Sequence, residues 1–175
     1  MNTVYDLPFH GNQLKEGWQV SQVLSAYTGF PFSPQFAIGY DPVGIGGIEG
    51  FRPNYSVGVA GCSPYHILGD PAQWYDPNCY VQQPLGTFGN VGRNTLRGPG
   101  LLDLDMSLSK ETKLREHMNL QFRAEFFNIL NHPNWAGSSF DYTILSGGAI
   151  NPTAGRLTTT ATSSRQIQFA LKLRF

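Results

Sequence analysis

The chain has 175 residues, of which 14% are charged, and its 12 basic and 12 acidic residues give a formal net charge of zero. A neutral chain lacks the basic field that holds nucleic acid, so we expect no nucleic-acid partner. Aromatic residues make up 13% of the sequence, which argues against disorder, and no window has the roughly 18 consecutive apolar residues of a transmembrane helix.

Two segments near the start alternate between apolar and polar residues, at 3–9 and 17–28. A period of two is typical of a β-strand with one apolar face. Gln22 interrupts the apolar side of the second segment. A long connection, 29–100, follows, and short hairpins are expected within it at 36–40 and 55–60.

Three later segments alternate more strictly, at 101–110, 118–130 and 165–175. They exceed the usual strand length of about 5–6 residues and approach the roughly 9–11 residues of a tilted strand that crosses a membrane. The residues expected to face lipid are Leu102, Leu104, Met106, Leu108, Met118, Leu120, Phe122, Phe126 and Ile167. The residues expected to face the lumen of a barrel are Asp103, Asp105, Gln121, Arg123, Glu125, Gln168 and Lys172.

The connections between these strands alternate in length. Segments 10–16 and 110–117 are short, whereas 29–100 and 131–164 are long. Outer-membrane barrels have short periplasmic turns and long extracellular loops. The sequence therefore predicts an all-β fold, an antiparallel up-and-down meander of four to five long strands. The smallest membrane barrels have about 8 strands, so this chain would be a piece of a larger barrel, one of several copies, or outside a membrane.

Six segments carry a resemblance to a known family, in this order: YDLPF (5–9), GWQVSQVLSAYTGFPFS (17–33), GTFGNVGRNTLRGPG (86–100), LDLDMSLSK (102–110), LQFRAEFFNILNHPNW (120–135) and RQIQFALKLRF (165–175). They resemble the C-terminal end of TonB-dependent outer-membrane receptors, of the Oar-like type with a carboxypeptidase-regulatory-like N-terminal domain. The resemblance implies a fragment of a barrel of about 22 strands, in the outer membrane of a Gram-negative bacterium.

The resemblance also implies a role and partners. The chain would close the barrel of a receptor that imports an unknown nutrient, and it would need no cofactor. Its partners would be the remainder of its own barrel and plug, the outer-membrane assembly machinery, the energy-coupling TonB complex and the lipid bilayer. The last strand resembles the C-terminal assembly signal, although Ala170 stands where the family usually has Gly. The signal residues are Phe169, Leu171, Leu173 and Phe175.

The sequence contains little that indicates catalysis, so we expect no enzyme. Asp103 and Asp105 would lie roughly 6.5–7 Å apart along one strand face, a separation that overlaps that of an inverting glycosidase pair. We favour two lumen-facing carboxylates, with Arg123 on the neighbouring strand as a candidate partner. His10, His66, His117 and His132 lack metal-site spacing, so neither a metal nor a cofactor is expected.

The long connection 29–100 holds two further features. Its segment GNVGRNTLRGPG carries Arg93 and Arg97; turn formation is the simpler explanation, and contact with an anion or a sugar is the alternative. Cys62 and Cys79 would form a disulfide if this connection is extracellular, with free buried thiols as the alternative. Closing this loop, whose ends are 17 positions apart, would contribute roughly 3 kcal/mol in the chain-entropy model.

Two other functions stay open. The chain could be a secreted, soluble β-sheet module that recognises glycans through aromatic loops, or the product of a degraded gene with no function. The apolar strand faces distinguish the membrane barrel from the soluble module. A soluble module must cover these faces with a second layer, whereas a barrel exposes them to lipid.

Overall fold

The computed structural model describes residues 1–47, 50–63, 65–136, 143–145 and 147–175. Two compact units make up the chain. We call Met1–Tyr27, Leu101–Asn134 and Thr160–Phe175 the sheet unit, and Thr28–Gly100 with Trp135–Thr159 the loop unit. Among the described residues, no helix has the length and apolarity needed to cross a membrane.

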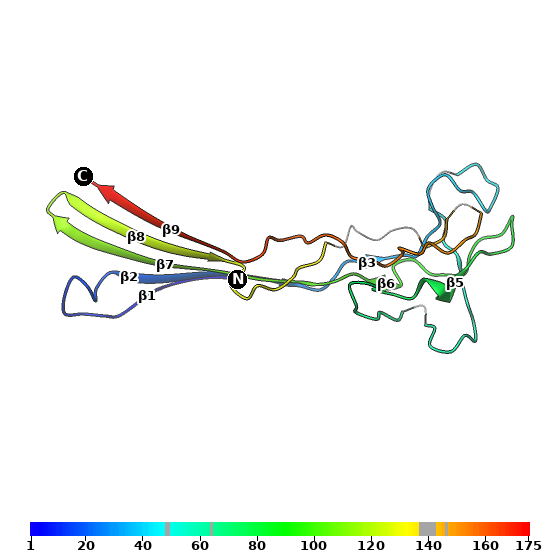
Figure 1. Cartoon of the computed structure of the whole chain (residues 1–175), viewed down its shortest axis with the longest axis horizontal. Coiled ribbons are helices and arrows are strands. Elements are labelled where there is room, and N and C mark those ends of the chain that lie inside the picture. Colours follow the sequence, from blue (N-terminus) through cyan, green and yellow to red (C-terminus); the bar gives the residue numbers. More distant parts are fainter. Residues whose placement is uncertain (48–49, 64, 137–142, 146) are drawn as a thin grey trace. The chain divides into compact units, whose positions relative to one another are not determined.

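The sheet unit is a single antiparallel sheet (Figure 1). Its strands are β1 (Asn2–Asp6), β2 (Trp18–Tyr27), β7 (Leu101–Arg115), β8 (Met118–Phe127) and β9 (Gln166–Arg174). They lie in the order β1-β2-β7-β8-β9, so each strand pairs with the next long strand along the chain. The predicted all-β, up-and-down antiparallel meander is confirmed.

The register aligns the apolar positions of neighbouring strands. Leu108 lies opposite Val20 of β2 and Ala124 of β8, and Ala124 lies opposite Phe169 of β9. Residues directly opposite each other point to the same side of an antiparallel sheet. The alternation within each strand therefore becomes one apolar face that continues from β2 to β9.

The β7–β8 connection is shorter than the sequence predicted. We expected a charged turn over 110–117, but β7 continues to Arg115 and only Glu116 and His117 separate it from β8. A register shift between Lys113 and Arg115 accommodates the pairing at this end. Backbone pairing persists here because it needs no apolar side chain, whereas the prediction rested on side-chain alternation.

Two strands stop earlier than expected. Strand β8 ends at Phe127 instead of residue 130, because Asn128 has a φ of 46° and leaves the extended conformation. Strand β1 ends at Asp6 instead of residue 9. Pro8, which has no N–H to donate, follows soon after.

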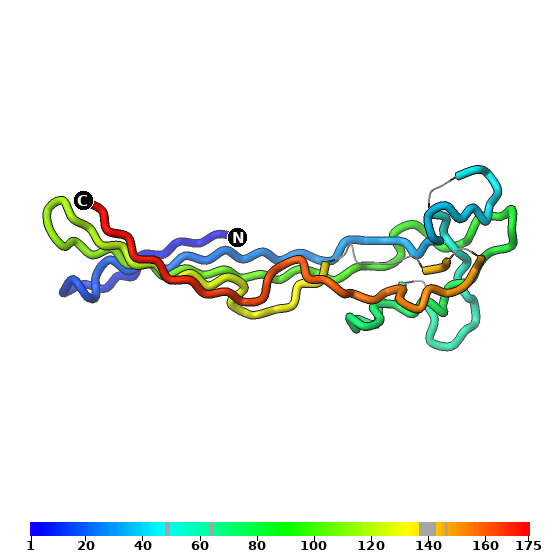
Figure 2. Tube along the Cα trace, turned by 45° about the horizontal axis from the view of Figure 1, so that its top comes forward, coloured from blue at the N-terminus to red at the C-terminus, as the bar shows by residue number. Residues whose placement is uncertain are grey.

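The two short turns lie at one end of the sheet, where the C-terminus also lies (Figure 2). The long connections 28–100 and 128–165 join the strands at the opposite end, because β2 runs into the first of them and β8 into the second. The expected separation of short turns from long loops is therefore present in the sheet unit.

The loop unit contains short strand pairs. Strand β3 (Pro31–Phe32) pairs with β6 (Leu96–Arg97), and β4 (Asn54–Tyr55) pairs with β5 (Tyr80–Val81), which follows the 3₁₀ turn Pro77–Cys79. The expected hairpins at 36–40 and 55–60 are wrong: Phe36 forms a bridge with the distant Ile144, and Tyr55 pairs with Tyr80.

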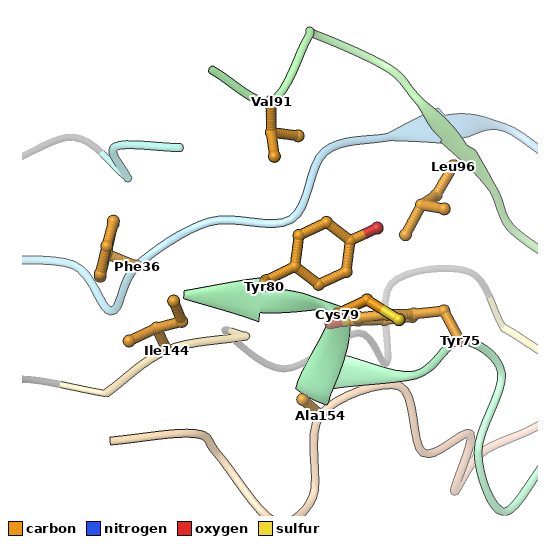
Figure 3. Close-up of a cluster of buried hydrophobic side chains, with 8 residues drawn as sticks. All are labelled: Phe36, Tyr75, Cys79, Tyr80, Val91, Leu96, Ile144 and Ala154. Atoms are coloured by element: carbon orange, nitrogen blue, oxygen red, sulfur yellow. The ribbon is translucent and has the colours of Figure 1, made fainter. Parts of the chain in front are cut away.

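Aromatic and aliphatic side chains form the core of the loop unit (Figure 3). Its buried members are Phe36, Tyr75, Cys79, Tyr80, Val91, Leu96, Ile144 and Ala154. They come from both segments of the loop unit, so the long connection and the second, shorter one fold around a common core.

Candidate functional site

The first candidate site is the apolar face of the sheet unit. All the residues predicted to face lipid lie on this side, since the register places them opposite one another or two positions apart. On β9, Phe169 is 70% exposed and Leu171 is 69% exposed. The rings of Phe122 and Phe169 stack across β8 and β9, with centroids 6.3 Å apart.

Gln22, Lys110 and Thr112 are polar residues on this face, and Thr112 lies opposite Leu120. Gln22 lies opposite Met106. Lys110 lies opposite Trp18 and Phe122, but its Nζ donates to the carbonyl oxygens of Gln13, Leu14 and Glu16 at 2.7, 3.1 and 2.8 Å. The ammonium group also lies 5.1 Å from the centre of the Trp18 ring. Lys110 therefore carries its charge to the short β1–β2 turn while its stem stays on the apolar side.

The opposite face is polar, and hydrogen bonds cross it from strand to strand. The hydroxyls of Ser21 and Ser107 are 2.7 Å apart. Gln168 of β9 donates to the carboxylate of Glu125 on β8. Every residue predicted to face the lumen lies on this side, because each is one position away from an apolar-face residue.

The expected pairing of Arg123 with Asp103 or Asp105 is wrong. Arg123 lies opposite Ser109 and forms an ion pair with Glu125 at 3.3 Å. Ser109 is four positions from Asp105, which is roughly 13 Å along a strand. Separation along the strand therefore keeps Arg123 away from both aspartates.

The two aspartates belong to a polar cavity at the loop end of the sheet. The cavity has a volume of about 500 Å³, and hydroxyl and amide side chains of residues 162–168 line it together with Asp103 and Asp105. Asp105 Oδ1 accepts the backbone N–H of Asn128 at 2.9 Å, whereas Asp103 Oδ1 is buried without a hydrogen-bond partner. The cavity thus offers acceptors to a solute that carries hydroxyl groups.

Asparagines that the sequence analysis did not single out hold this end of the sheet together. The Asn128 side chain donates to the carbonyl oxygens of His132 and Ser163, each at 3.0 Å. Asn134 Oδ1 accepts the N–H of Leu102 at 2.8 Å, and its Nδ2 donates to Thr162 at 3.0 Å. The signal that could have revealed them is the repeated Asn in the segment FFNILNHPN, a residue type that closes turns with its side chain.

Cys62 and Cys79 form a disulfide in the loop unit. Among the described residues, the one group with metal-ligand geometry consists of these cysteines and Asp76. Both sulfurs are in the disulfide, so neither can bind a cation as a thiolate. Tyr80, the residue after Cys79, belongs to the same core. Burial has the largest effect on the pKa of its hydroxyl, the neighbouring Tyr75 and Tyr55 act in the same direction, and together they raise that pKa far above the usual tyrosine value.

The two arginines of the glycine-rich segment, Arg93 and Arg97, have different surroundings. Arg97 donates to the carbonyl oxygen of Gly29 at 3.4 Å, and its own carbonyl oxygen accepts the indole N–H of Trp74 at 2.7 Å. A β-carbon on Gly29 would lie only 1.7 Å from the carbonyl oxygen of Gly98, so the backbones approach closely here. Arg97 is therefore part of the frame of the loop unit, whereas Arg93 lines a separate cavity.

Comparison with known proteins gives one match. A family model described as an outer membrane beta barrel domain matches residues 1–168, nearly the whole chain. No curated protein and no solved structure matches the chain.

Proposed function

Because the chain belongs to the outer membrane beta barrel domain family and is an outer-membrane protein, we propose that it supplies strands to the barrel of a TonB-dependent receptor that imports a nutrient. The family places the chain in a lipid bilayer and suggests a non-enzymatic protein. TonB dependence, transport and an Oar-like identity are the finer parts of this proposal. They rest on the six-segment resemblance in the sequence.

The observation that carries the proposal is the continuous apolar face from β2 to β9. Strands β7 and β8 have 15 and 10 residues, enough to cross the apolar layer at the tilt of a barrel strand. The polar face then lines the lumen, and Lys110 reaches the periplasmic turn. A soluble glycan-binding module would have to cover the apolar face, and Phe169 and Leu171 are about 70% exposed.

The two edges of the sheet define the partners that the proposal requires. Strands β1 and β9 are the outer strands of the sheet. An unpaired edge in lipid costs several kcal/mol for each unsatisfied backbone group. We therefore assign the remaining strands of a barrel of about 22 strands to these edges, with a plug in its lumen.

The same proposal gives β9 a second role. Phe169, Leu171, Leu173 and Phe175 would form the signal that the outer-membrane assembly machinery recognises. All four side chains are exposed, and three of them follow one face of the strand at the sheet edge. An exposed apolar edge strand can be bound by another strand, because its outer backbone groups are free to pair.

The test compares a strain that lacks this protein with a strain that lacks TonB. We expect both to lose growth on the same limiting nutrient, because import through such a receptor needs both components. Growth is measured on a panel of single nutrients at low concentration, where passive entry is slow. A plasmid copy of the protein should restore growth in the first strain and leave the second unchanged.

The control measures whether the protein still assembles in the outer membrane when TonB is absent. In the strain without TonB, the protein should still give an outer-membrane band that shifts on boiling, seen with an antibody to residues 166–175. A nutrient that enters through this protein equally well without TonB would contradict the transport proposal. A band in the soluble fraction would contradict its membrane part.

A further inference from the structure

A small cavity in the loop unit combines two arginines with two aromatic rings. It has a volume of about 210 Å³ and is lined by Gly50, Phe51, Arg52, Phe88, Gly89 and Arg93. We infer that this cavity binds a small ring compound that carries one carboxylate, such as an acidic monosaccharide or an aromatic acid. The inference concerns binding alone and does not require that the ligand is imported.

Segments far apart in the sequence form a rigid frame for the cavity. Asn54 Oδ1 accepts the N–H of Asn90 at 2.9 Å, and Asn90 Oδ1 accepts the N–H of Tyr55 at 2.8 Å. The N–H of Val91 donates to the carbonyl oxygen of Pro53 at 3.2 Å, and the Val91 side chain belongs to the buried core. These reciprocal bonds clamp residues 53–55 to residues 90–91, next to the cavity lining.

Gly89 allows the two segments to approach. A β-carbon at this position would lie 2.0 Å from the carbonyl oxygen of Arg52 and 2.4 Å from that of Pro53. Both atoms belong to the backbone, so a larger residue could be accommodated only by moving a chain segment. The cavity therefore depends on a close backbone contact that glycine alone permits.

The two arginines leave donors free for a ligand. Arg52 uses its Nε to donate to the carbonyl oxygen of Val91 at 2.8 Å, which fixes the guanidinium and leaves its terminal nitrogens without a hydrogen bond to a described residue. The Arg93 guanidinium has no hydrogen bond or ion pair among the described residues. No acidic residue is among the described residues of the lining; Glu49, which precedes Gly50, lies outside them.

The basic residues of this cavity are arginines and not lysines, which favours a ligand with a carboxylate group. Every lysine of the chain, Lys15, Lys110, Lys113 and Lys172, belongs to the sheet unit, so all the basic residues of the loop unit other than histidine are arginines. A guanidinium presents a planar fork that matches a carboxylate, whereas an ammonium group acts as a point charge. Two such groups beside one cavity favour an anion with two or more acceptor oxygens.

The two phenylalanines of the cavity favour a ligand that is flat and partly apolar. Phe51 is half-buried, packs against the core of the loop unit and accepts the N–H of Phe36 at its carbonyl oxygen. Phe88 is 71% exposed, although burial of a phenyl ring away from water is favourable. The volume lies below the roughly 300 Å³ of a drug-sized site, so a single ring fits and an oligomer does not.

The experiment measures binding to the whole protein extracted from outer membranes in detergent. The probes are D-galacturonate and benzoate, with D-galactose and benzyl alcohol as their uncharged counterparts, and inorganic phosphate. Ligand-observed NMR titration gives the Kd of each. We expect each carboxylate to bind roughly tenfold or more tightly than its uncharged counterpart.

Variants locate the site. Arg93→Gln should weaken carboxylate binding roughly tenfold, and Arg93→Lys should restore only part of it because the fork is lost. Arg156→Gln, an exposed arginine elsewhere in the loop unit, is the matched control and should leave the Kd unchanged. Phe88→Ala should weaken both ring compounds, whereas Tyr65→Ala, at an equally exposed aromatic residue, should not.

Three results would overturn the inference. They are equal affinity for galacturonate and galactose, unchanged affinity in Arg93→Gln, or binding of phosphate without binding of either ring compound. Arg52→Gln is not used, because its Nε bond to Val91 makes it part of the frame. Since import is not measured, failure of the transport proposal would leave these results unaffected.

Discussion

At the scale of single residues, the carboxylate of Asp41 closes a turn of the loop unit. Its Oδ1 accepts the N–H groups of Val43 and Gly44 at 3.1 and 2.7 Å, and its Oδ2 accepts that of Gly46 at 2.7 Å. Desolvation acts to raise the pKa of this carboxyl, but the backbone N–H groups of Gly44, Gly46 and Val43 outweigh it and hold the pKa below its usual value. The ionised carboxylate therefore organises residues 41–46.

This lowered pKa predicts how the turn responds to acid. Because the ionised form is favoured in the folded state, the stabilisation is complete above the usual carboxyl pKa of about 3.9 and is lost as the pH falls through the lowered value. We expect the amides of Gly44 and Gly46 to stay protected at neutral pH and to lose protection at strongly acidic pH. Hydrogen exchange of a peptide covering 41–47, corrected for intrinsic rates, measures this.

Asp41→Asn provides the control for this expectation. The amide oxygen can keep part of the turn, but it cannot ionise, so the protection of residues 41–47 should be lower and independent of pH. If Asp41→Asn shows the same loss on acidification as the original protein, another group controls the turn.

At the scale of strands, the two faces of β7 should tolerate charge very differently. Leu108 lies opposite Val20 and Ala124 on the apolar face, and Ser107 lies opposite Ser21 and Glu125 on the polar face. An arginine on the lipid side of a barrel costs about 2–4 kcal/mol near the bilayer midplane. Leu108→Arg should therefore reduce the heat-modifiable outer-membrane band strongly, and Ser107→Arg should leave it nearly unchanged.

These two substitutions are neighbours in the sequence and introduce the same side chain. Their comparison therefore separates the effect of the face from the effect of charge or size. Equal band intensities for the two variants would contradict the assignment of the apolar face to lipid.

The long strands could be predicted from the sequence because each pattern is local. A period of two over about ten residues reports which side chains share a face, whatever the partner strand is. The same method ended this strand at Lys110, although the backbone pairs as far as Arg115. Local patterns therefore identified the faces more reliably than the strand ends.

The candidate sites were harder to predict because they depend on distant contacts. The clamp between Asn54 and Asn90 joins residues 36 positions apart, and nothing in either local sequence indicates the other. The glycine-rich segment suggested Arg93 and Arg97 as a pair that could contact an anion. In the structure, however, Arg93 lines a cavity together with Arg52 and not with Arg97. The register that separates Arg123 from Asp103 and Asp105 is likewise a property of paired strands and not of one strand.

At the scale of the whole molecule, the two units have different sources of stability. The sheet unit is held by ladders between long strands, whereas the loop unit has a small core and the Cys62–Cys79 disulfide. Removing this cross-link, which spans 17 positions, should destabilise the loop unit by about 3 kcal/mol in the chain-entropy model. The sheet unit contains no cysteine and should be unaffected.

Reduction followed by proteolysis tests this difference. With a reductant present, trypsin should cleave the membrane-embedded protein after Arg93, Arg97 and Arg156, and the fragments are identified by mass spectrometry. The boiling-dependent band shift should persist, because the strands stay paired. A Cys62→Ser, Cys79→Ser double variant should be cleaved equally with and without reductant; dependence on reductant in that variant would contradict the explanation.

The absence of lysine from the loop unit has a practical consequence for anyone who studies the protein on cells. Amine-reactive dyes and biotin esters, the usual reagents for tagging cell-surface proteins, have no side-chain target in residues 28–100 or 135–159. If those residues face the medium, as proposed, these two segments would escape labelling with such reagents even when the protein is abundant. Glyoxal-type reagents, which modify guanidinium groups, would detect it and would at the same time report on the access to Arg93.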